Sequence, residues 1–195
     1  MNVHLIRTAL GKEKADLAII NGMIVNVYSG EIYPGGVAIR GEQIAAVGDI
    51  ESALGEDTEI IDAQGAYITP GFIDGHIHPE STSLAVRPFA QILLQHGVTT
   101  VMTDFHEVGV VAGLEGIEAI LEEARETDLK VYFVVPSHVP FSPDLETSGG
   151  RFDPEVIRRA LRRRDAVGLS ECVCTYIQSE YDQLLISMDD TLRAK

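Results

Sequence analysis

The chain of 195 residues contains little cysteine: Cys172 and Cys174 are its only two. Two cysteines are too few for the disulfide framework of a small secreted domain. They also form no Cys-x-x-Cys pair, which excludes the zinc deaminases of nucleobases that depend on that motif. We expect both thiols to be reduced, in a core or in the wall of a site.

The chain also lacks long apolar runs and an excess of basic residues. No stretch approaches the ~20 apolar residues that cross a bilayer, and residues 1–14 contain no apolar segment typical of a signal peptide. There are 15 basic and 30 acidic residues, and the resulting net charge of −15 argues against a nucleic-acid partner. We therefore predict a cytoplasmic protein that binds a small molecule, without membrane or nucleic-acid contacts.

The pattern of apolar residues changes near residue 68. Residues 15–68 alternate short β-prone runs with turn signals, such as Asn21-Gly22 and residues 34–36, and this predicts a small β-sandwich-like unit over residues 1–68. From residue 69 strands alternate with helices, which predicts an α/β fold with a parallel sheet. The expected strands are residues 98–103, 131–135 (buried on both faces) and 166–169, and the expected helices are residues 88–96, 114–125, one that begins at Asp153-Pro154, and 181–192.

Two histidines, His76 and His78, follow an apolar segment typical of a short strand. On a strand, residues i and i+2 point to the same side, so both imidazoles would face one point. Neutral imidazole is a ligand for zinc, iron and related ions. Taken alone, such a pair also fits two unrelated histidines on one face of a strand.

Titratable side chains follow every expected strand of the second part. In βα barrels, functional residues lie at the C-terminal ends of the strands, so this placement predicts a site along one edge of the sheet. For several of them a solvated loop is the alternative interpretation. The residues are His76 and His78 at the first strand, Asp104, His106 and Glu107 after the second, Ser137 and His138 after the third, and Glu171 after the fourth.

The motifs around these residues resemble those of the adenine deaminase branch of the amidohydrolase superfamily. The resemblance covers about residues 16–195. It rests on residues 75–81 (GHIHPES), 96–101 (HGVTTV), 103–107 (TDFHE), 136–140 (PSHVP), 146–149 (ETSG) and 168–171 (GLSE).

This resemblance implies metal-dependent hydrolytic deamination of adenine to hypoxanthine and ammonia. It implies a divalent metal (Mn, Fe or Zn, binuclear in the full-length family) held here by His76, His78 and Glu171. In the family, a glutamate at this place bridges two metals, where other amidohydrolases use a carboxylated lysine. Residues implied near the metal or the purine substrate are Glu80, Ser81, Asp104, His106, Glu107 and His138.

The sequence also departs from the family pattern. His138 stands where a cysteine is usual, and residues 172–174 (CVC) replace a Met-Met-Asn-like stretch. A βα barrel takes about 250 residues, so residues 69–195 are expected to form its first half, about four βα units. The aspartate for proton transfer is then expected beyond Lys195.

Two alternatives to an adenine deaminase remain. One is a cyclic-amide hydrolase of the same superfamily, which Glu171 in place of lysine disfavours. The other is a non-catalytic fragment, or a metal-binding half that needs a partner chain. We expect the chain to form a homo-oligomer or to self-associate, because an unpaired sheet edge is prone to pair with another chain.

Overall fold

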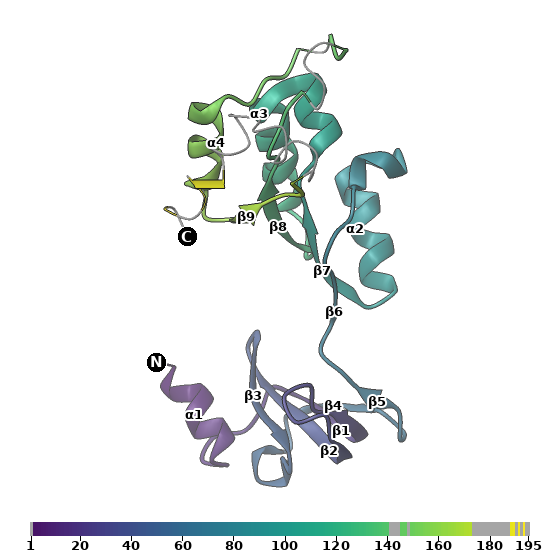
Figure 1. Cartoon of the computed structure of the whole chain (residues 1–195). Helices are drawn as coiled ribbons and strands as arrows, with labels where there is room; N and C mark the ends of the chain where they lie inside the picture. The colour runs from purple at the N-terminus through teal and green to yellow at the C-terminus, as the bar shows by residue number, and fades with distance from the viewer. Residues whose placement is uncertain are drawn as a thin grey trace. The chain divides into compact units, whose positions relative to one another are not determined.

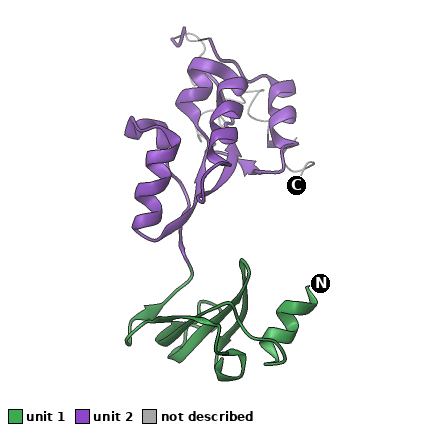
Figure 2. Cartoon of the chain, turned by 180° about the vertical axis from the view of Figure 1, so that it is seen from behind, with its two compact units in different colours: residues 1–70 green, residues 71–195 purple. Residues whose placement is uncertain are grey.

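The computed structural model describes residues 2–140, 145–147, 149–172, 188, 189, 191 and 193. It divides into two compact units, residues 1–70 and 71–195 (Figure 2). The sequence places this division after residue 68. Most of the helix expected over residues 181–192, and Cys174, lie outside the described residues.

Residues 1–70 form a sheet unit that begins with a short helix, α1 (Val3–Ala9), which the sequence patterns do not predict (Figure 1). The strand order is β3-β2-β1-β4, and β5 also pairs with β1. β2 is antiparallel to β1 and β3, whereas β4 and β5 are parallel to β1. The strands are β1 (Leu17–Val25), β2 (Ile32–Arg40), β3 (Gln43–Gly48), β4 (Glu59–Asp62) and β5 (Tyr67–Ile68), with a 3₁₀ turn at Glu51–Ala53.

The two turn signals named from the sequence lie inside strands, so both turn predictions are wrong. Asn21-Gly22 forms a β-bulge within β1, where Asn21 has a φ of 57° and its amide donates to the Asp62 carboxylate over 3.1 Å. A Cβ on Gly22 would lie 2.3 Å from the Ile68 side chain, so a larger residue there requires that side chain to move. Asn tolerates the left-handed conformation in bulges as well as in turns, which explains the error. Residues 34–36 are part of β2.

Residues 71–195 contain a parallel sheet with strand order β6-β7-β8-β9, and helices connect successive strands (Figure 1). This succession confirms the α/β fold expected from the sequence. The elements are β6 (Phe72–Asp74), the 3₁₀ helix η2 (Pro79–Thr82), α2 (Val86–Gln95), β7 (Val98–Thr103), α3 (His106–Ala124), β8 (Lys130–Val135), α4 (Pro154–Leu161) and β9 (Ala166–Leu169).

The main core lies between β8, β9 and the helices α3 and α4. Phe133 and Val135 of β8 are fully buried, whereas Tyr132 between them is 43% exposed. The expectation that β8 is buried on both faces is therefore wrong, because its apolar run does not reveal that the helices cover one face. The core contains Phe105, Leu114, Ile117, Leu121, Phe133, Val135, Val139, Phe152, Ile157, Ala160, Leu161 and Ala166.

Local sequence signals predict the start of α4 correctly but not the start of α3. α4 begins as expected: Asp153 is the N-cap and accepts from the backbone N–H groups of Glu155 and Val156 over 2.9 Å, with Pro154 in the first turn. α3 begins eight residues before the expected position, at His106. Gly113, with a φ of 66°, interrupts it, so the helical pattern from residue 114 marks only its second part.

No helix in the described part of the chain is both long enough and apolar enough to cross a membrane.

Two arginines form ion pairs with one aspartate, Asp165, at the N-terminal end of β9. Arg163 donates to both oxygens of Asp165 (Nε to Oδ1 and Nη2 to Oδ2, each 2.9 Å), and Arg125 Nη2 donates to Oδ2 over 2.9 Å. Burial alone would raise the pKa of Asp165. The two guanidinium groups together lower it by more, so the pKa lies below its usual value.

We expect Asp165→Asn to lower the free energy of unfolding by about 1 kcal/mol at pH 7, since it removes charge-assisted hydrogen bonds that are partly exposed. A carboxyl with a lowered folded-state pKa stabilises above its unfolded pKa of about 3.9 and ceases to do so as the pH falls through the folded value. Urea unfolding between pH 7 and pH 2 tests this, with exposed Asp128→Asn as the control. A deficit that is the same at every pH would contradict the assignment.

Candidate metal centre at the strand ends

His76 and His78 lie just beyond β6, which ends at Asp74. The expectation that both histidines lie on the strand itself is therefore wrong, because the strand ends before them. The Asp74 carboxylate accepts from the N–H of His76 (3.1 Å), and the N–H of Ile77 donates to the carbonyl of Met102 (3.1 Å), which fixes the segment beside β7. The imidazoles still converge: their Nε2 atoms are 3.1 Å apart, with the ring planes at 80°. Two ring nitrogens at this separation face a common point, as two ligands of one ion do.

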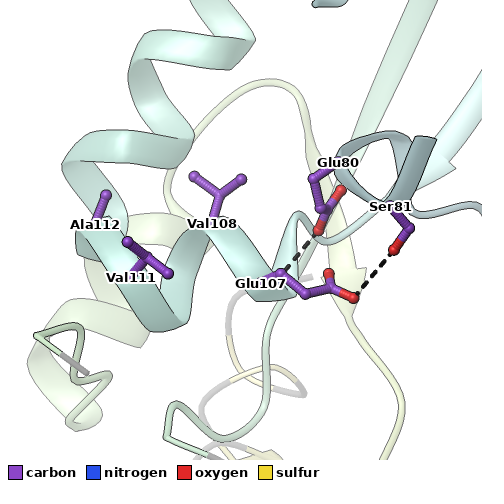
Figure 3. A pocket seen from close by; sticks show the side chains of 6 residues that line it. All are labelled: Glu80, Ser81, Glu107, Val108, Val111 and Ala112. Atoms are coloured by element: carbon purple, nitrogen blue, oxygen red, sulfur yellow. Dashed lines mark hydrogen bonds between the residues drawn. The ribbon is translucent and has the colours of Figure 1, made fainter. Parts of the chain in front are cut away.

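The helix η2 follows directly and connects this segment to the start of α3. Glu80 Oε1 accepts from the N–H of Glu107 over 3.3 Å, and the Ser81 hydroxyl donates to Glu107 Oε1 over 3.4 Å (Figure 3). These two contacts place two carboxylates side by side. They line a pocket of about 310 Å³ whose opposite wall is apolar and consists of Val108, Val111 and Ala112 (Figure 3).

Asp104 lies at the C-terminal end of β7 and is 1% exposed. Its Oδ1 accepts from the N–H of His106 (3.2 Å), and its Oδ2 accepts from the Ser170 hydroxyl (2.6 Å). Phe105 adopts the left-handed conformation between Asp104 and α3, with a φ of 51°. This turn directs the carboxylate toward the histidine pair.

The three carboxylates surround the second nitrogen of His78. Its Nδ1 lies 3.3 Å from Asp104 Oδ1, 3.3 Å from Glu107 Oε2 and 3.8 Å from Glu80 Oε1. One ligand atom each of His78, Glu80 and Asp104 lies within 4.8 Å of the others. Within the described residues, His78 Nδ1 and Glu80 Oε2 are buried without an aligned hydrogen bond. Imidazole and carboxylate donors are those preferred by zinc, iron and manganese, so the histidine pair and the carboxylates beside it fit a divalent metal.

The charges of this cluster depend on one another. Burial, followed by a hydrogen bond with Glu107, raises the pKa of Glu80 to about 7. The same hydrogen bond lowers the pKa of Glu107 to about 2, so the proton that the pair shares resides on Glu80. Burial lowers the pKa of His78, but Asp104, Glu107 and Glu80 together raise it more. Protons on Glu80 and His78 thus offset part of the negative charge that the carboxylates bring to this cluster.

The third and fourth strands bring a second group of residues to the same edge. Ser137 and His138, both buried, follow β8. The Ser137 hydroxyl contacts His138 Nδ1 and donates to the backbone carbonyl of Glu171 over 2.8 Å. The rings of His106 and His138 are 6.0 Å apart. Burial, and then His106, lower the pKa of His138, which favours a neutral imidazole.

The structure therefore brings most of the candidate residues together, in two groups. The first group consists of His76, His78, Glu80, Ser81, Asp104 and Glu107, and the second of Ser137 and His138. His106 contacts the first group through Asp104. Glu171, expected as a metal ligand, has an exposed side chain and does not belong to the cluster of His78, Glu80 and Asp104. Its role as a ligand stays a prediction.

Sequence reasoning missed one residue of the site, Ser170. The available signal was its position between the end of β9 and Glu171. Cys172 follows as a half-buried thiol, whose pKa burial raises.

Comparison with known proteins assigns this arrangement to a family. The model of the amidohydrolase family matches residues 67–173. The adenine deaminase of Moorella thermoacetica is 43% identical over 168 residues, which cover 86% of this chain and 28% of that protein. The adenine deaminase of Listeria monocytogenes is 41% identical over 183 residues, which cover 94% of this chain and 30% of that protein. The chain thus spans less than a third of the length of these curated relatives.

Two solved structures share the fold of this chain. An adenine deaminase aligns with a TM-score of 0.59 at 22% identity, covering 91% of this chain and 49% of that chain. An N-acyl-D-glutamate deacylase from Bordetella bronchiseptica, solved with zinc and a phosphonate inhibitor, aligns with a TM-score of 0.58 at 20% identity, covering 88% of this chain and 42% of that chain. The family model matches more than half of this chain and includes every residue of the candidate site. The chain belongs to the amidohydrolase family.

Proposed function

We propose that this chain supplies the metal-binding part of an adenine deaminase, which hydrolyses adenine to hypoxanthine and ammonia. The observation that carries the proposal is the convergence of His76 and His78 beside three carboxylates. This geometry occurs in a chain that is 41–43% identical to proteins named adenine deaminase. The reaction needs a strong oxygen nucleophile at neutral pH, and a divalent metal supplies it by lowering the pKa of bound water from 15.7 toward about 7.

In this proposal His76 and His78 hold the metal through their facing Nε2 atoms, and Glu171 is a further ligand. The Ser137 hydroxyl holds the Glu171 backbone at the edge of the sheet where the histidines lie. The metal is manganese, iron or zinc, in a binuclear centre. Asp104 and Glu107 orient His78, since their oxygens lie 3.3 Å from its Nδ1.

We assign the adenine base to the pocket beside Glu80 and Glu107. A purine is flat and apolar on its faces, which suits the wall of Val108, Val111 and Ala112. Its ring nitrogens and amine need donors and acceptors, which the carboxyl pair and Ser81 offer. His106, whose N–H donates to Asp104, and His138, whose ring is 6.0 Å from that of His106, are assigned to substrate contact.

Further strands are expected next to this sheet. Within the described residues, β6 and β9 each pair on one side only. Open strand edges are prone to pair with other strands. We propose that a second chain or another part of the same protein covers them.

A chimera tests the function. This chain replaces the aligned segment of the Moorella thermoacetica enzyme. Ammonia release is measured with adenine, and ring opening to the carbamoyl amino acid is measured with hydantoin and dihydroorotate. Adenine should be preferred. His76→Ala with His78→Ala should lower that activity by at least about 10³-fold, since a metal contributes several kcal/mol of transition-state stabilisation.

Three outcomes would contradict the proposal. One is a preference for a cyclic amide, which favours the cyclic-amide hydrolase. Another is unchanged activity without the two histidines. The third is a folded, metal-loaded chimera without activity, which favours a non-catalytic metal-binding segment.

A further inference from the structure

We propose that Ser170 is a positioning residue of the metal centre: acting through Asp104, it determines which nitrogen of His78 faces the metal. The inference rests on the proposed metal centre and assigns a role to a residue that is not one of its ligands. Ser170 follows β9, whereas His78 follows β6, so the connection joins the two outer strands of the described sheet.

Ser170 is held firmly at the end of its strand. It is 9% exposed, and its N–H donates to the Val135 carbonyl over 2.8 Å. Its hydroxyl donates to Asp104 Oδ2 over 2.6 Å, a distance typical of a charge-assisted O–H···O⁻ bond. Because the backbone of Ser170 is fixed, this bond also fixes the carboxylate that accepts it.

Asp104 transmits this constraint to the histidine. With Oδ2 bound to Ser170, Oδ1 is left to accept from the N–H of His106 and to face His78 Nδ1 at 3.3 Å. An acceptor at this position favours the tautomer with the proton on Nδ1. The lone pair of that tautomer is on Nε2, the atom that faces His76 Nε2.

Glu107 also lies 3.3 Å from His78 Nδ1, but its side chain is 54% exposed, against 1% for Asp104. A carboxylate exposed to solvent constrains the ring less than a buried one with both oxygens in use. Loss of the Ser170 hydroxyl would leave Asp104 with fewer fixed contacts and free to rotate. Loss of such an outer partner typically lowers metal affinity by about 10–100-fold.

The test uses two measurements on the 195-residue chain. Zinc dissociation constants come from competition with a chromophoric chelator. Long-range ¹H–¹⁵N spectra of the zinc-free protein, recorded at a pH at which the His78 ring is neutral, report the tautomer of His78, assigned with His78→Ala. We expect Ser170→Ala to weaken zinc binding by about 10-fold or more and to shift the His78 proton toward Nε2. Ser170→Thr, which keeps the hydroxyl, should restore both. Thr100→Val removes another buried hydroxyl, on β7 four residues before Asp104, and should change neither.

The result that overturns the proposal is an unchanged His78 tautomer in Ser170→Ala. Equal effects of Ser170→Ala and Ser170→Thr, or of Thr100→Val, would also overturn it, because they indicate a general packing defect. The tautomer is read without metal, so this result stands apart from the proposed function. Failure of the wild-type chain to bind zinc counts against the metal centre, whereas loss of zinc binding in His78→Ala with no effect of Ser170→Ala counts against Ser170 alone.

Discussion

Replacement of both His76 and His78 by alanine should leave the chain without divalent metal after dialysis. The wild-type chain should retain zinc or manganese. The two Nε2 atoms are 3.1 Å apart and supply two donors of the proposed centre. Loss of an outer partner alone costs about 10–100-fold in affinity, so the loss of two direct ligands should exceed about 100-fold. Elemental analysis of the dialysed protein measures the metal content.

The chain offers a matched control for this experiment. His4 lies in α1 and His96 caps the end of α2, and neither belongs to the cluster. His4→Ala with His96→Ala removes the same number of imidazoles and should leave the metal content unchanged. If the two double variants hold equal amounts of metal, His76 and His78 are not the ligands.

Phe133→Ala should destabilise the second unit by about 3–5 kcal/mol, the cost of a large cavity in a core. Phe133 is fully buried among α3, α4 and β9, where the surrounding helices cannot close the space without moving. Urea unfolding followed by hydrogen exchange of the β8 amides measures the effect on this unit separately from residues 1–70.

The neighbouring residue provides the comparison. Tyr132 is on the same strand but is 43% exposed, and Tyr132→Ala should cost clearly less than Phe133→Ala. Similar costs for the two variants would show that both faces of β8 are packed. That result would restore the expectation drawn from the sequence and contradict the structure.

The order of elements in residues 71–195 follows from local patterns, because a β-branched run or a capped amphipathic stretch needs little tertiary information. Asp153-Pro154 marks a helix start that the structure confirms. The errors occur where one local signal serves two structures. Asn21-Gly22 suits a bulge as well as a turn, and the apolar run of β8 suits a strand covered on either one or two faces.

The candidate site was predictable in residue type but not in contacts. Strand ends converge in a parallel sheet, and this alone brings Asp104 and Glu107 to the histidines. The side of His78 on which each carboxylate lies depends on the left-handed turn at Phe105 and on the contact of η2 with α3. The only sequence signal for Ser170 was its position after β9, and its partner was not predictable because Asp104 lies 66 positions away in the chain.

The ion pairs of Asp165 and the candidate metal ligands lie at opposite ends of the parallel sheet. This separation determines which substitutions the protein can accept. The bonds of Arg125 and Arg163 to Asp165 lie where β9 begins, whereas the candidate ligands lie where the strands finish. Substitutions among the ligands leave those bonds in place. A library of variants directed at the strand finishes would therefore sample new substrate preferences in molecules that still fold, and a scaffold of this kind lends itself to repeated functional divergence.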